Sequence, residues 1–408
     1  MSPDWTSTTS QTPLLKPLRA AMVVQFAAGG AVIPFVSMLM RDRGLTIGQM
    51  SLILSASSAT LMVCPFLWGM LADRFVPLNR LFLWSNLGAF LALGFLFSQH
   101  TFWGLFAGFV AFTAFLNPSF TLVNALGFHH LPNPHEQFGH LRKWGSAGWI
   151  IPFLPIALWT ALRPGAGLDF TLGLGMVICL GMMLLSFRLP HTPPGAHGEG
   201  DEEDGSHAYL PAVKQLFHDS NYVVLLISMF LIAGSFNLLM FYTPPFLEDL
   251  GVKRPWIGPI QAIGVVFEIV LFTWQASFLR RWNYTGLILA GCLALLMRNA
   301  MFSTLNSPWI LSASFLLAGM FIVFYQTGTS MLVHHLASRE VRATAQTLLS
   351  ICSQGLGPMF ANWAAGRIAA HYGNSFRPVF VFATLLSLLA TLLILSRRKQ
   401  INAIGGLK

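Results

Sequence analysis

Residues 221–246 read NYVVLLISMFLIAGSFNLLMFYTPPF, a run that contains no charged side chain. A helix crosses the hydrocarbon core of a bilayer with about 20 predominantly apolar residues, so this run is long enough to span a membrane. The whole chain has a matching composition, with 54% hydrophobic and 10% charged residues, whereas soluble domains carry about 25% charged residues. We therefore exclude a soluble globular protein and predict a protein embedded in a lipid bilayer.

The same length criterion, applied outward from this run, finds eleven further candidate membrane helices. The twelve lie near residues 17–40, 47–72, 80–98, 102–127, 144–162, 168–187, 221–246, 257–279, 284–303, 308–334, 343–366 and 376–396. The first is too long for a secretory signal peptide and lacks a small-residue cleavage site, so we expect it to be retained. The sequence predicts an all-α membrane protein of twelve transmembrane helices.

The longest polar segment separates the sixth candidate helix from the seventh. It contains a Pro-Pro pair and the acidic run GEGDEEDG at 198–205, and such a composition cannot bury enough apolar surface to fold. Its histidines, His191, His197 and His207, could hold a metal together with the acids, but we favour a solvated tether. We predict an N-terminal six-helix bundle at 1–190, a flexible cytoplasmic linker at 191–219 and a C-terminal six-helix bundle at 220–408.

The two halves repeat short signals at offsets near 200 residues. Pro34 at the end of the first helix corresponds to Pro245 at the end of the seventh, and Arg142 before the fifth corresponds to Arg342 before the eleventh. Such offsets indicate a duplicated six-helix unit. Parallel repeats related by an axis along the membrane normal build the major facilitator fold, whose substrate site lies at the repeat interface. We therefore predict that fold.

The 24 Lys and Arg residues occur singly or in short clusters between the apolar runs. About two thirds of them fall in alternate segments that include both termini, which is the distribution expected of cytoplasmic loops. This pattern is not the clustered stripe that follows nucleic-acid phosphates. We expect an inner-membrane protein of a bacterium with both termini in the cytoplasm and no nucleic-acid partner.

One acidic residue, Glu268, lies deep within a candidate helix, whereas the other fourteen Asp and Glu lie in tails, loops, the linker or helix ends. A carboxylate at membrane depth costs several kcal/mol unless it is paired, hydrated or protonated, so it marks a functional site by default. Gln261, Gly264 and Gln275 share its helical face. We predict that Glu268 couples transport to protons with Arg298 as its partner; the alternative is an ion pair that only holds helices together.

Further polar residues within the candidate helices suggest a water-filled cavity. Each of them can line this cavity or hydrogen-bond between helices, and the sequence leaves both roles open. The candidates for the cavity are Gln25, Asn117, Asn124, Asn237, Gln261, Tyr325 and Gln326.

The loop after the second helix reads GMLADRFVPLNR at 69–80 and resembles the signature loop of the major facilitator superfamily. The resemblance assigns Gly69, Asp73, Arg74 and Arg80 to a gating motif. Asp73 at a helix end can pair with Arg74, Arg80 or a neighbouring helix and latch the cytoplasmic gate. The alternative is an interfacial anchor without a gating role.

Signatures of enzymes and cofactor sites are missing. The sequence contains no P-loop, no GxSxG and no HExxH motif, so ATP-driven transport and hydrolysis have no support. Its four cysteines lie in apolar runs without a CxxC or Cys/His spacing. We expect no catalytic residue, no metal and no cofactor.

A family resemblance appears at FGHLRKWGSAGWI, residues 138–150. This segment resembles the start of helix five in the 3-phenylpropionate transporter family and in the nucleoside:proton symporters, two groups of the major facilitator superfamily. GVVFEIVLF at 264–272 resembles the first group, and VRATAQ at 341–346 resembles the second. The resemblance implies cavity or coupling roles for Arg142, Ser146, Trp149 and Glu268.

Departures from both groups leave the substrate open. Val323 stands where nucleoside carriers have an Asp, and Val265 replaces their Gln. Asn124 stands where phenylpropionate carriers have an Asp. The sequence therefore does not choose between the two solute classes.

Together these observations predict a monomeric secondary active transporter, with protons, a small-molecule substrate and the lipid bilayer as its partners. We expect proton-coupled uptake of an aromatic acid, a nucleoside or a sugar-like solute. The alternatives are a proton-independent facilitator or exporter of the same fold, and a non-transporting membrane sensor.

Overall fold

The computed structural model describes residues 12–131, 134–190, 192–193, 214, 216–337 and 341–404. Every regular element within these ranges is helical. In chain order they are α1 (Thr12–Val32), η1 (Ile33–Phe35), α2 (Val36–Asp42), α3 (Ile47–Arg74), α4 (Leu78–Ser98), α5 (Phe102–His130), α6 (Pro134–Ile150), α7 (Phe153–Leu162), α8 (Asp169–Ser186), α10 (Ser220–Asp249), α11 (Arg254–Thr304), α12 (Pro308–Ala313), α13 (Phe315–Met320), η2 (Phe321–Gln326), α14 (Thr327–Leu336), α15 (Arg342–Ser350), η4 (Ile351–Leu356), α16 (Gly357–His371), α17 (Phe376–Ser396) and α18 (Arg398–Ile404).

The predicted all-α membrane fold is confirmed. Eleven stretches in the described ranges are long and apolar enough to cross a membrane, and apolar side chains such as Leu91, Leu154 and Val177 are exposed on their outer faces. The remaining predicted span, near 343–366, lies in the consecutive helical segments α15, η4 and α16. Polar residues such as Gln346 and Gln354 make this stretch less apolar than the others.

Two predicted spans lie in the single long helix α11. Asn283 has φ 58° and ψ 175°, which is not helical, so a kink at this residue separates the two spans. Two other segments, η2 and η4, are π-helical. π-Helical turns are rare and occur frequently at functional sites.

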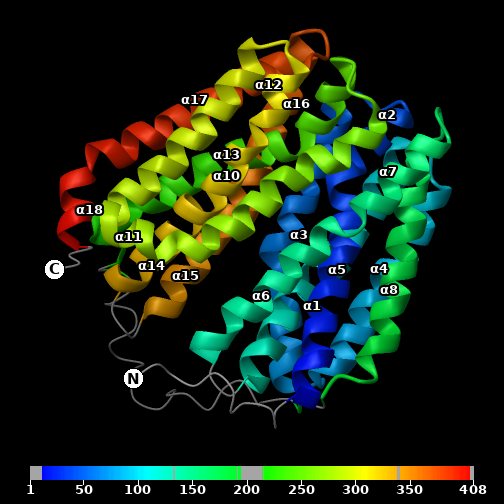
Figure 1. Cartoon of the computed structure of the whole chain (residues 1–408), viewed down its shortest axis with the longest axis horizontal. Helices are drawn as coiled ribbons and strands as arrows, with labels where there is room; N and C mark the ends of the chain where they lie inside the picture. The colour runs from blue at the N-terminus through cyan, green and yellow to red at the C-terminus, as the bar shows by residue number, and fades with distance from the viewer. Residues whose placement is uncertain are drawn as a thin grey trace.

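The helices form two bundles that lie side by side (Figure 1). In the first, α1 packs against α6 and α8, and α4 packs against α5 and α8. In the second, α10 packs against α16 and α17, and α11 packs against α13 and α17. The bundles meet through α3 with α16 and through α7 with α11. In Figure 1 they converge near α2 and α7 and separate toward α6, α14 and α15.

The predicted boundary between the bundles falls in 191–219, and most of that segment, including His191, His197 and His207, lies outside the described residues. The domain limits therefore stay a prediction.

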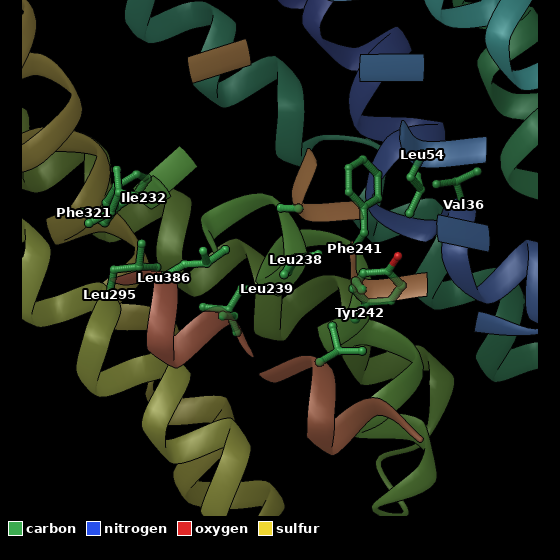
Figure 2. Close-up of a cluster of buried hydrophobic side chains, with 14 of the residues drawn as sticks. Val36, Leu54, Ile232, Leu238, Leu239, Phe241, Tyr242, Leu295, Phe321 and Leu386 are labelled. Atoms are coloured by element: carbon green, nitrogen blue, oxygen red, sulfur yellow. The ribbon is translucent and has the colours of Figure 1, made fainter. Parts of the chain in front are cut away.

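A single cluster of buried apolar side chains extends across the interface between the bundles (Figure 2). Val36 and Leu54 come from the first bundle, and Ile232 and Leu386 from the second. In lipid, van der Waals packing and interhelical hydrogen bonds hold helices together because lipid tails are as apolar as the side chains. Tyr242 adds such a bond, since its hydroxyl lies 2.6 Å from that of Ser51.

Glycines allow the helices that carry the polar residues to approach closely. A Cβ atom on Gly319 of α13 would lie 2.7 Å from the backbone nitrogen of Glu268 in α11. A Cβ on Gly148 of α6 would lie 2.8 Å from the Cα of Val23 in α1. Small residues at helix contacts let backbones come together, so these glycines fix where α11 and α6 place their side chains.

We predict that Gly319→Val lowers the thermal stability of the detergent-solubilised protein. The new side chain must displace α11, and overpacking of this kind costs about 1–3 kcal/mol. The control is Gly173→Val in α8, because a Cβ there meets nothing within 4 Å. Equal melting temperatures for the two variants would contradict the role of Gly319.

Candidate functional site

Two connected cavities lie between the bundles. The larger, of about 1010 Å³, is lined by α3, α5 and α6 from the first bundle and by α10, η2, α15 and η4 from the second. The smaller, of about 300 Å³, lies next to it and is lined by α6, α7, α10, α11 and α13 among others. The two share the lining residues Phe26, Arg142, Trp149, Phe236, Met240 and Gln326.

Glu268 of α11 lies on the wall of the small cavity and is 9% exposed. Its carboxylate makes a side-chain polar contact with Ser146 and interacts with the charge of Arg142, and both residues belong to α6 of the other bundle. No direct ion pair joins Glu268 and Arg142 among the described residues, so their charges attract each other without direct contact. The only acid found deep in a span therefore faces the opposite bundle.

The guanidinium of Arg142 lies over an aromatic ring. Its Cζ is 4.4 Å from the centre of the Phe26 ring, and its Nη1 is buried without a hydrogen-bond partner in the described part of the chain. The contact with the ring orients the guanidinium but does not neutralise its charge. Arg142 thus presents a positive charge to both cavities.

Among the described residues Arg298 of α11 forms no ion pair with Glu268, and the predicted pairing of the two residues stays a prediction. The Arg298 side chain is 3% exposed, and its Cζ lies 4.1 Å from the centre of the Phe315 ring in α13. Its Nε has no hydrogen-bond partner among the residues that the structure describes. Glu268 is directed across the interface to α6, whereas Arg298 is directed to α13 within its own bundle. Both residues nevertheless line the small cavity.

Most of the other predicted cavity residues line one of the two cavities. They are Asn117, Asn124, Arg142, Ser146, Trp149, Asn237, Gln261 and Gln326.

Two predicted cavity residues instead connect helices. Gln25 is buried, donates a hydrogen bond to Ser119 and accepts one from Asn86. Tyr325 is buried with its hydroxyl 2.7 Å from that of Ser228. Neither lines the large or the small cavity, and their role in a cavity stays a prediction.

The sequence analysis missed the aromatic walls of the small cavity. These residues lie in apolar runs where nothing distinguishes a ring that faces a cavity from one that faces lipid. They are Phe26, Phe153, Phe236 and Phe315.

The predicted gating motif spans the end of α3 and the start of α4, where Arg74 and Arg80 are exposed. The side chain of Asp73 lies outside the described part of the structure. Its role as a latch therefore stays a prediction.

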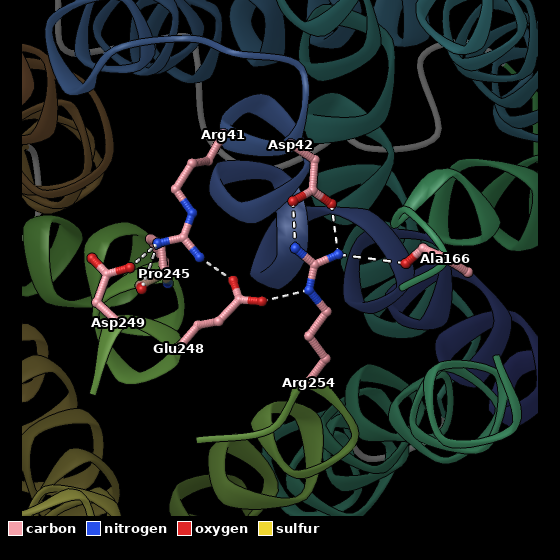
Figure 3. A network of polar contacts seen from close by, with 7 residues as sticks. All are labelled: Arg41, Asp42, Ala166, Pro245, Glu248, Asp249 and Arg254. Atoms are coloured by element: carbon pink, nitrogen blue, oxygen red, sulfur yellow. Dashed lines mark hydrogen bonds and ion pairs between the residues drawn. The ribbon is translucent and has the colours of Figure 1, made fainter. Parts of the chain in front are cut away.

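A network of ion pairs joins the bundles at the opposite end of the molecule (Figure 3). Arg41 of α2 contacts Glu248 and lies 2.6 Å from Asp249, both at the end of α10. Arg254 of α11 lies 2.5 Å from Asp42 and 2.5 Å from Glu248. The pairs of Arg41 with Glu248 and Asp249, and of Arg254 with Asp42, cross the interface and hold the bundles together at this end, whereas Arg254 and Glu248 both belong to the second bundle. We call these five residues the ion-pair gate; the sequence analysis missed it.

The model of the MFS_1-like family matches residues 15–383. The chain belongs to that family. Among its relatives, the "Putative nucleoside transporter YegT" of Escherichia coli (strain K12) is 24% identical over 352 residues, which cover 83% of this chain and 80% of the relative. The "Probable 3-phenylpropionic acid transporter" of the same organism is 24% identical over 327 residues, covering 78% and 82%.

The fold of this MFS_1-like chain also matches solved structures. The crystal structure of the nucleoside transporter NupG superimposes with a TM-score of 0.81 and 19% identity, covering 95% of this chain and 99% of that one. The predicted twelve-helix major facilitator fold and the family resemblance are confirmed. The chain is a transporter of the major facilitator type and not an enzyme.

We predict that Arg254→Gln in the ion-pair gate favours a state in which this end is open. Exposed ion pairs contribute about 0.2–1 kcal/mol each, so losing the pair with Asp42 across the interface should raise the open population up to about five-fold. The measurement uses spin labels at positions 164 and 253 in a protein without the four native cysteines. Pulsed electron paramagnetic resonance should give a longer distance between the labels in Arg254→Gln than in the protein that keeps Arg254.

The control for this experiment is Arg43→Gln. It removes the 2.6 Å ion pair to Asp169, but both partners lie in the first bundle. An equal shift in the two variants, or no shift in Arg254→Gln, would show that the ion-pair gate does not hold this end closed.

Proposed function

We propose that the protein is a proton-coupled transporter that carries a small organic solute through the cavities between its bundles into the cytoplasm of a bacterium. One observation carries the proposal: Glu268 is a buried carboxylate in one bundle that interacts with Ser146 and Arg142 of the other, on the wall of a cavity. An ionisable group within the membrane that faces a cavity is the usual element of a proton relay.

The geometry suggests how proton binding moves the bundles. An ionised Glu268 attracts Arg142 across the interface, whereas a protonated Glu268 does not. Major facilitator transporters expose a fixed central site alternately to each side by rocking one bundle against the other. Loss or gain of this attraction changes the relative stability of the two rocked states, so a proton gradient can drive the cycle.

The described state fits the cytoplasm-facing part of such a cycle. The ion-pair gate closes the end that the charge distribution predicts to be periplasmic. The large cavity extends the other way, along Asn124 of α5 and Gln346 of α15, toward the end with Arg74 and Arg342. A solute released from this state would enter the cytoplasm, where both termini are proposed to lie.

Relatives named for nucleosides and for 3-phenylpropionic acid support a small cyclic solute. The alternative is a proton-independent facilitator or an exporter of the same fold. A facilitator equilibrates its solute whatever the pH gradient, and an exporter moves it outward.

We predict that Glu268→Gln abolishes accumulation against a gradient but retains exchange. The amide has nearly the same shape as the carboxyl group but cannot bind or release the coupling proton. The measurement is uptake of a labelled panel of aromatic acids, nucleosides and sugars into proteoliposomes, with and without a pH gradient.

Asp169→Asn is the matched acid-to-amide control, because Asp169 pairs with Arg43 at the surface and lines neither cavity. It should accumulate solute like the wild type. Concentrative uptake by Glu268→Gln at the wild-type level would exclude Glu268 as the coupling group. Loss of the folded variant from the membrane would instead indicate a purely structural role.

A further inference from the structure

The buried polar atoms left without partners around the small cavity can all donate hydrogen bonds. Among the described residues they are Arg142 Nη1, Thr243 Oγ1, Gln261 Nε2 and Arg298 Nε. An arginine side chain has only donors and no acceptor. A buried donor without a partner costs about 1–3 kcal/mol, and more when it is charged. A ligand that fits this cavity must therefore supply acceptors.

The formal charges around the small cavity do not balance. Its lining contains two arginines, Arg142 and Arg298, and one carboxylate, Glu268. The remaining lining residues carry no formal charge, so the sum is one positive charge while Glu268 is ionised and two when it is protonated. A buried charge needs a partner of opposite sign, and the ring of Phe315 below Arg298 does not supply one. While Glu268 is ionised, the missing partner is a single negative charge.

The size and the walls of the small cavity limit the rest of the ligand. Its volume of about 300 Å³ is at the lower end of the range of about 300–1,000 Å³ for ligand pockets. Phe26, Trp149, Phe153, Phe236 and Phe315 supply aromatic walls. This space suits one ring with its substituents.

We infer that the solute is a small cyclic monocarboxylate whose carboxylate binds to Arg298, and that it crosses the membrane together with one proton on Glu268. This inference rests on the proposed function and specifies its substrate class. Arginine binds carboxylates through two parallel N–H donors, and such charge-assisted bonds are about twice as strong as neutral ones.

The inferred cycle moves no net charge. Protonation of Glu268 leaves both arginines without a counter-charge, and the arriving carboxylate then supplies one. The proton binds to one carboxylate and the solute brings another, so one positive and one negative charge leave together on the cytoplasmic side. The empty carrier returns with Glu268 ionised as it began. A pH gradient therefore drives accumulation, and a membrane potential alone does not.

The first test compares acids with matched neutral amides. Tryptophan fluorescence follows binding, since Trp149 lines the cavity. The ligands are two acids, benzoate and 3-phenylpropionate, and their amides, benzamide and 3-phenylpropionamide. At least one acid should bind about 10- to 100-fold more tightly than its amide, as expected for a charge-assisted pair. Arg298→Gln should remove this preference.

The matched control is Arg163→Gln. The guanidinium of Arg163 also lies over an aromatic ring, 4.2 Å from Trp159, but it is exposed and lines neither cavity. This variant should keep the preference for acids. If Arg298→Gln does not fold, Arg298→Lys, which keeps the charge without the paired donors, should retain a reduced preference. The inference would be overturned if neither acid bound more tightly than its amide.

The second test separates the two driving forces in proteoliposomes, with protein-free liposomes as background. A pH gradient at zero potential should drive accumulation of the acid that binds best, and a potassium-diffusion potential at equal pH should not. Accumulation driven by the potential alone would overturn the electroneutral cycle while leaving proton coupling intact. If no solute from the wider labelled panel responds to the pH gradient, the proposed function itself fails.

Discussion

The attraction between Glu268 and Arg142 is the interaction on which the proposed mechanism depends. It acts across the interface of two bundles whose helices each satisfy their own backbone hydrogen bonds, as helices in lipid must. Apolar packing between such bundles has little directional preference, and a lipid tail can replace it at small cost. Charges near the cavity therefore contribute most to the difference in free energy between one arrangement of the bundles and another.

Two kinds of charged contact cross the interface in the described part of the chain, and they differ in environment. The ion-pair gate is half-buried, with side-chain exposures from 19% to 52%, so each of its pairs is weak and can break and re-form. Glu268 is 9% exposed and has one polar neighbour and one charged neighbour. The weak pairs of the ion-pair gate let this end of the molecule close and reopen. The attraction between Glu268 and Arg142 makes the arrangement of the bundles depend on whether Glu268 carries a proton.

The sequence predicted the membrane helices and the importance of Glu268, because apolar length and an isolated acid are local properties. It did not predict the partner of Glu268. Spacing along α11 places Glu268 and Arg298 in adjacent spans, but the kink at Asn283 sets which way each faces. Gln25 and Tyr325 were assigned to the cavity for a similar reason, since a polar residue in a span looks the same whether it faces water or a neighbouring helix. The ion-pair gate was missed because its charges resemble ordinary charges at helix ends.

The location of the ion-pair gate has a consequence for how the carrier senses its surroundings. Glu248 binds both Arg41 and Arg254, so one carboxylate holds together contacts that salt in the medium can screen. At an ionic strength of about 0.15 M the screening length is about 8 Å, and it shortens to about 3 Å at 1 M. Glu268 is buried at 9% exposure, so ions in the medium screen its attraction to Arg142 much less. The balance between the two orientations of the carrier should thus follow the salinity outside the cell, whereas its response to protons should not.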